Sequence, residues 1–465
     1  MSLFHPLWPD RPSSENLELG RSLAESGMTT GSPTNRERAY ISTIAAYFDD
    51  GLNKSEQARL AAFAEAWQAV HNVYPEDKEA TAFYSLAQLT QAPQGDKSHR
   101  IQREVGPLLE RILESSPNHP GAHHYLIHAY DFPPLAEGAL EVARNYASIG
   151  PQVTHALHMS THIFTLLGLW DEVAANNIKA GDAALDLSRD MGAVSLHYTH
   201  ALDYLAYAYL QMGIDGEAEA VLDNLTALQP PFQTSNRAAI VYAFSAVPAR
   251  LAVERRDWER AAGLQLPTHE TFGWEAGNYP ADDLYPFIAP TLFARGMGLV
   301  NLGRFQEAEA DIAKLRQMEN DLGSWGSYWQ NEIAIQRTSV QAWRSLRSGD
   351  TLSAISSMQA AVALESGSFK HPLYPNEVTH ASELLGDMLR ETGAFEAAIS
   401  AYEISLSRSP NRLNALFGIA LAAEGAGSLS LASRYFQKVL ELTRSATADL
   451  PQITYARSYV EALNP

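Results

Sequence analysis

Apolar residues recur at positions i, i+3, i+4 and i+7 along most of the chain, and Gly, Pro, Asn or Asp interrupts each run. This period is typical of amphipathic α-helices, and the alternating pattern of half-buried strands is almost absent. The pattern therefore predicts an all-α protein made of many short helices.

A repeat of 34 residues is clearest between Thr379 and Arg412, and the unit that starts at Leu413 has the same spacing. Small residues such as Gly386 and Ala398 stand where the two helices of a pair must approach closely, and Pro410 closes the unit. This is the tetratricopeptide (TPR) period and pattern. We therefore predict a TPR-like α-solenoid, a superhelix of antiparallel helix pairs.

The same 34-residue period fits units that begin at Pro120, Thr154 and Thr199. We expect four segments along the chain. They are an extended N-terminal segment (1–35), a solenoid with a His-rich concave face (36–265), an irregular insertion (266–286) and C-terminal TPR repeats that continue the solenoid (287–465).

Histidine is concentrated in the first two of these units: seven of the 15 His lie between His119 and His162. In a TPR, the second, fifth, ninth and twelfth residues of each repeat face the concave surface. At these positions stand His124, His128, Asp131, His155, His158, His162, His200, Asp203 and Tyr207. Apolar residues fill the packing positions of the same helices, so the pattern places the imidazoles on one surface.

Two of these histidine pairs, His124/His128 and His158/His162, have the i, i+4 spacing that puts both rings on one helix face. The pairs occupy equivalent positions of adjacent repeats, whose helices pack about 8–10 Å apart. We therefore predict metal ligands at His124, His128, His158, His162, His155 and His200. The chain has no Cys, so the donors are N and O atoms, which suit Zn, Fe, Mn or Cu.

Three further residues of the same surface are predicted to be catalytic. Asp131 and Asp203 are candidates for orienting a ligand or for acting as general base to a bound water. Tyr207 is a candidate for supplying a hydroxyl to the substrate. His119 and His123 are expected to pack, cap or face solvent, because neither falls on the concave register.

The net charge and the N-terminal residues bear on whether the protein binds nucleic acid or a membrane. The net charge of −20 argues against a nucleic-acid partner and against docking on anionic lipid. No run approaches the ~20 apolar residues of a membrane span. The chain does not open on a basic segment followed by an apolar one, so we expect a cytoplasmic protein without a membrane partner.

The stretches "HPGAHHYLIHAYD" and "HALHMSTHIF" resemble the HPGxxHYxIHAxD and HxxHMxxHIF motifs of a bacterial family of TPR-repeat proteins. The resemblance extends in order from "HPLWPD" near the start to "PNRLNALFGIALAAE" near the end. It implies a TPR fold and a recurrent polar set of His124, His128, Asp131, His155, His158 and His162.

These observations favour a metal-dependent enzyme, hydrolytic or oxidative, that acts on a small molecule or peptide in the concave groove. HExxH, Walker A and GxSxG motifs are absent, so a zincin-type protease, a P-loop nucleotide enzyme and a serine hydrolase are not indicated. The alternative is a non-enzymatic scaffold that binds an extended peptide, as TPR arrays commonly do. The sequence leaves this choice, the metal and the oligomeric state open.

Overall fold

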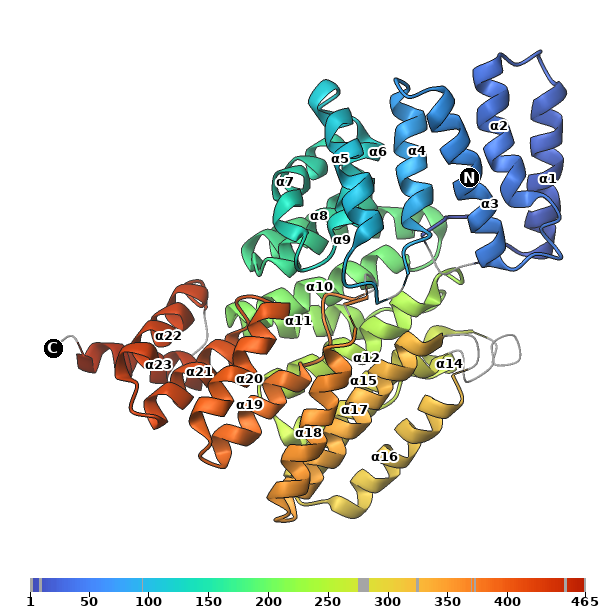
Figure 1. The fold of residues 1–465 in the computed structure, drawn as a ribbon. Helices are drawn as coiled ribbons and strands as arrows, with labels where there is room; N and C mark the ends of the chain where they lie inside the picture. Colours follow the sequence, from blue (N-terminus) through green and yellow to red (C-terminus); the bar gives the residue numbers. More distant parts are fainter. Residues whose placement is uncertain are drawn as a thin grey trace. The chain divides into compact units, whose positions relative to one another are not determined.

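The computed structural model describes residues 3–7, 11–93, 95–274, 284–322, 326–368, 370–371, 374–446 and 450–463. The regular structure of these ranges is helical (Figure 1). Within the described residues, the β-type pairing is limited to an isolated bridge between Val194 and Phe232. The all-α prediction is confirmed. The chain forms two compact units: residues 1–131 with 138–150, and residues 132–137 with 151–465.

The first unit consists of helices that each pack against the next one along the chain. Its helices are α1 (Ser14–Thr29), α2 (Asn35–Phe48), α3 (Glu56–Val73), α4 (Lys78–Leu89), α5 (Arg100–Ser115), α6 (Pro120–Tyr130) and α7 (Leu140–Ile149). A short 3₁₀ helix, η1 (Ala136–Ala139), precedes α7.

The second unit is also a series of helices connected by short turns, and most of them pack as sequential pairs. They are α8 (Thr154–Leu166), α9 (Trp170–Met191), α10 (Leu196–Met212), α11 (Asp215–Thr226), α12 (Arg237–Glu254), α13 (Trp258–Ala262), α14 (His269–Phe272), α15 (Tyr285–Asn301), α16 (Phe305–Asn320), α17 (Gly326–Arg347), α18 (Thr351–Glu365), α19 (Ala381–Glu391), α20 (Phe395–Arg408), α21 (Leu413–Gly425), α22 (Leu429–Leu442) and α23 (Pro451–Leu463).

The TPR prediction is confirmed most clearly by the pairs α19/α20 and α21/α22. The ring of Tyr402 on α20 is fully buried between Gly386 of α19 and Gly418 of α21. A Cβ atom at Gly386 would lie 2.6 Å from this ring, and one at Gly418 would lie 2.3 Å from it. Small residues therefore let neighbouring helices approach closely enough to enclose an aromatic ring.

We expect Gly418→Ala to lower the free energy of unfolding by about 1–3 kcal/mol, because overpacking forces a well-packed core to shift. Tyr402 cannot yield easily, since its hydroxyl donates a 2.7 Å hydrogen bond to Asp387. The matched control is Gly216→Ala on α11, where a Cβ would meet nothing within 4 Å. Urea unfolding of both variants measures the difference, and equal stabilities would contradict this packing.

Two of the predicted segments differ in the structure. Residues 1–35 were expected to be extended, but α1 occupies Ser14–Thr29. The Ser13 side chain caps α1 by accepting from the Asn16 N–H, and Leu17 and Ala24 are buried on one side of the helix. In the predicted insertion 266–286, the helix α14 and the first two residues of α15 lie among the described residues, whereas 275–283 lie outside them.

The predicted boundaries at 265 and 286 are not boundaries between the two units, which divide the chain near residue 150 instead. Among the described residues, no helix is both long enough and apolar enough to cross a bilayer.

Candidate metal centre

Three imidazoles converge in the second unit, on the adjacent helices α8 and α10. His158 and His162 lie one turn apart on α8, and His200 lies on α10. The ring centroid of His200 is 4.3 Å from that of His158 and 6.4 Å from that of His162. His158 and His162 are buried, whereas His200 is half-buried.

The nitrogen positions match the geometry of one bound ion. One ring nitrogen from each residue lies within 4.8 Å of the other two. The Nε2 atoms of His158 and His162 are 3.2 Å apart. Two nitrogens at ~2.0–2.1 Å from a single tetrahedral ion are about 3.3 Å apart, so this pair already has the spacing of two ligands.

The side chain of Asn177 on α9 orients the ring of His158. Its Nδ2 donates to the Val173 carbonyl at 2.9 Å, so its Oδ1 is the atom that faces His158. Nδ1 of His158 therefore carries the hydrogen and donates to Oδ1 at 2.8 Å. The lone pair of His158 is left on Nε2, which is the nitrogen that points toward His162.

Burial holds the imidazoles of His158 and His200 in their neutral form. Burial lowers the pKa of His158 well below its usual value, and His162 lowers it further. Burial also lowers the pKa of His200 well below its usual value, and His158 adds to that shift. Neutral imidazole is the form that binds metal. The fully buried Tyr204 packs its ring against all three histidines, with the centroids 4.6 Å apart at His158.

Two more histidines lie beside this set. His155 precedes His158 by three residues on α8, and His197 precedes His200 by three on α10. Their ring centroids are 5.8 Å apart, and both side chains are half-buried. Burial lowers the pKa of His197. Lys370 adds a positive charge near His158, where it contributes to the lowered pKa of that ring.

The predicted catalytic residues of α10 belong to a different environment. Asp203 is buried and forms an ion pair with the fully buried Arg250. Burial raises the pKa of Asp203 to about 6, although Arg250 opposes this shift. The Tyr207 hydroxyl accepts from Arg412 Nη1 at 2.7 Å and from Asn376 Nδ2 at 2.9 Å. Both side chains are thus held by buried partners and are not brought among the three imidazoles.

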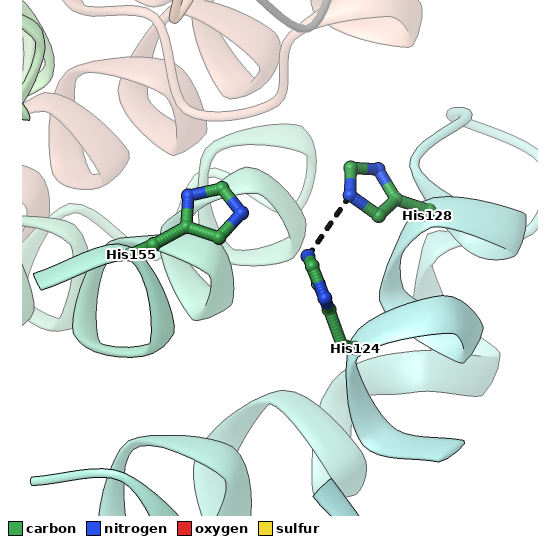
Figure 2. Close-up of side chains that lie close together, drawn as sticks. All are labelled: His124, His128 and His155. Carbon is green, nitrogen blue, oxygen red and sulfur yellow. Dashed lines mark hydrogen bonds between the residues drawn. The ribbon is translucent and has the colours of Figure 1, made fainter. Parts of the chain in front are cut away.

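The first unit contains a second histidine pair, on α6. The Nε2 atoms of His124 and His128 lie 3.1 Å apart (Figure 2). The ring of His124 stacks on Tyr146 of α7 with 5.9 Å between centroids and 13° between planes. This pair has the i, i+4 geometry that the sequence predicts. His155, also drawn in Figure 2, belongs to the second unit.

The remaining predicted positions on α6 have defined places. His119 caps α6, because its Nδ1 accepts from the Ala122 N–H at 3.1 Å. His123 is buried, with its ring nitrogens 2.8 and 3.3 Å from the carbonyl oxygens of Pro117 and Val142. Both fit the expected packing and capping roles. Asp131 is buried at the C-terminal end of α6, and its catalytic role stays a prediction.

Sequence reasoning missed His197, Tyr204 and Asn177. His197 carried a usable signal, because a spacing of three residues puts it on the same helix face as His200. His197 precedes the predicted start of the repeat at Thr199, whereas α10 begins at Leu196. Asn177 carried no such signal, since its role depends on how α9 packs against α8.

No protein-family model and no curated protein matches the sequence of this chain. Several solved structures are similar in fold at 12% sequence identity. A human IFIT1 dimer with m7Gppp-AAAA matches 92% of this chain and 85% of its own, with a TM-score of 0.38. A monomeric IFIT1 mutant with Gppp-AAAA matches 92% and 86%, with a TM-score of 0.40. Naa15/Naa10 bound to HypK-THB matches 93% and 66%, with a TM-score of 0.28.

The IFIT1 structures contain capped RNA, which contradicts the expectation that net charge excludes a nucleic-acid partner. That exclusion is wrong, because binding depends on where the Lys and Arg side chains lie and not on the charge summed over the chain. The chain's own helices and their sequential packing show an all-α, TPR-like helical-repeat architecture.

Proposed function

We propose that the second unit binds a divalent transition metal through His158, His162 and His200 and uses it for enzymatic chemistry. The observation that carries this proposal is the meeting of three imidazoles, with one nitrogen of each within 4.8 Å of the others. The donors are all nitrogen, which fits Zn, Fe or Cu and is less suited to Mn. A site with three protein ligands keeps a position for water or substrate, unlike a closed structural site.

The metal, when bound, supplies either a water activated for hydrolysis or a redox centre, and the substrate is a small molecule or peptide. The chain supplies the orientation and the environment. Asn177 holds His158 with Nε2 turned toward the other ligands, and Tyr204 covers one side of the three rings. The charge of Lys370 beside His158 favours a ligand that carries an anionic group.

His124 and His128 remain proposed ligands in the first unit. Their Nε2 atoms are 3.1 Å apart, which is close to the spacing of two nitrogen ligands on one tetrahedral ion. The TPR family resemblance points to the same histidines. The alternative function is a peptide-binding scaffold without a metal. A scaffold function explains why the surface of a TPR is polar. It gives no reason for three histidine side chains to converge with their ring nitrogens close together.

Cobalt(II) titration tests the proposal. Chelator-treated protein is titrated with Co²⁺, and visible absorption is recorded. We expect an intense, saturable d–d band, because nitrogen ligands in a tetrahedral arrangement give one and free hexaaqua cobalt does not. A titration with no such band and no saturation would favour the scaffold function.

Asn177→Leu is expected to weaken metal affinity about 10–100-fold, because it removes the acceptor that orients a metal-binding imidazole. Asn177→Asp keeps an acceptor at the same place and should retain most of the affinity. Competition against a chromophoric chelator measures both values. If the Leu variant is folded and binds as tightly as the parent, then Asn177 does not position His158.

A further inference from the structure

His158, His162 and His200 form one layer of histidines between α8 and α10, here called the first tier. His155 and His197 form a second tier one helical turn earlier, since each precedes a proposed ligand of its own helix by three residues. The two helices therefore present a second pair of facing imidazoles directly beside the first set. The ring centroids of this second pair are 5.8 Å apart.

This separation suits a shared ion. Imidazoles whose nitrogens lie ~2.0–2.1 Å from one ion place their ring centroids about 5–6 Å apart. Within the first tier the centroid separations are 5.0 Å for His158/His162, 4.3 Å for His158/His200 and 6.4 Å for His162/His200, and the 5.8 Å of the second pair lies among them. His155 and His197 are therefore close enough to bind one ion between α8 and α10 and far enough apart to admit it.

The spacing of the two tiers suits a pair of ions. Three residues advance an α-helix by about 4.5 Å. Metal ions in two-metal sites lie about 3.5–4 Å apart. Small tilts of the imidazoles would bring ions in neighbouring tiers to this separation, and both His155 and His197 are half-buried.

We propose that His155 and His197 hold a second divalent transition-metal ion next to the first, so that the second unit contains a binuclear centre. This inference rests on the proposed function, because it extends the same site. The donors of both tiers are imidazoles, and the nearby carboxylate of Asp203 is paired with Arg250. Such a donor set favours zinc or copper over manganese, which prefers carboxylates.

Metal stoichiometry tests the second ion. The full chain, made without a His-tag, is loaded with excess Zn²⁺, desalted and analysed for zinc per chain. We expect His197→Ala to bind one ion fewer than the parent, and His155→Ala, on the other helix, to do the same. His71→Ala in the first unit is the control and should bind as many ions as the parent.

Copper(II) loading gives a second readout. Two copper(II) ions in adjacent tiers couple magnetically, so the parent should show a weakened or broadened EPR signal relative to its copper content. In His197→Ala, the full signal of an isolated ion should appear.

The outcomes separate the two proposals. If the parent binds metal but neither His155→Ala nor His197→Ala lowers the stoichiometry, the second ion is refuted and the mononuclear centre stands. If the folded parent binds no zinc and no copper, both proposals fail.

Discussion

Replacing Arg412 by Met is expected to lower the free energy of unfolding by about 3–5 kcal/mol, which is the usual cost of removing one partner from a buried ion pair. The guanidinium of Arg412 is fully buried at the start of α21, and its two carboxylate partners, Glu254 and Glu383, are also fully buried. The substitution removes the cation that bonds to both carboxylates, and Glu383 keeps its 3.6 Å ion pair with Arg256.

The contacts of Arg412 explain the size of this effect. Nε donates to Glu383 at 2.6 Å, Nη2 donates to Glu254 at 2.8 Å, and Nη1 donates to the Tyr207 hydroxyl at 2.7 Å. These bonds join α10, α12 and α19 to α21. Because α10 also carries His200, this network holds one of the proposed metal-binding helices in place.

Urea unfolding followed by circular dichroism measures the effect. Arg457→Met on α23 is the matched control, because that side chain is exposed and its loss should cost less than about 0.5 kcal/mol. Neutralising the stranded carboxylates with Glu254→Gln and Glu383→Gln should recover part of the loss. A cost below 1 kcal/mol for Arg412→Met would show that the network is not a major source of stability.

Replacing His200 by Ala is expected to weaken binding of the first metal ion more than 100-fold. Removal of residues that merely orient a ligand costs 10–100-fold, and removal of the ligand itself should exceed that range. His200 is the better choice for this test, since it is half-buried and its loss disturbs the core less than the loss of His158.

Chelator competition with zinc gives the affinity of the His200→Ala variant, and thermal unfolding without metal shows whether it is folded. His71→Ala provides a histidine deletion that is far along the sequence from α8 and α10. An affinity within threefold of the parent, in a folded variant, would remove His200 from the ligand set.

The fold was predictable because its information is local. The positions of Gly386, Ala398 and Tyr402 within the 34-residue unit indicate close helix packing directly, and the structure places these residues in the α19/α20 contact. The helix α1 was missed because Pro, Ser and Gly near residues 1–35 suggest an extended chain. The Ser13 cap and the burial of residues on one side of the segment stabilise a helix there instead.

The candidate metal site was predictable only in part. Helical spacing put His158 and His162 on one face, and the repeat register added His200. The roles of Asp203 and Tyr207 depend on Arg250 and Arg412, which lie 47 and 205 residues further along the chain. No local pattern reveals such partners, so register alone could not distinguish a residue at the site from one in the buried network.

Metal content tests the central claim most directly. The full chain is expressed without a His-tag, purified without chelators and subjected to elemental analysis together with thermal unfolding. We predict at least one transition-metal ion per chain, a lower melting temperature after chelation, and recovery when the metal is returned, because a ligand that binds only the folded state stabilises it. Folded protein with no transition metal, and with no rise in melting temperature on addition of Zn, Fe, Mn or Cu, would contradict the account.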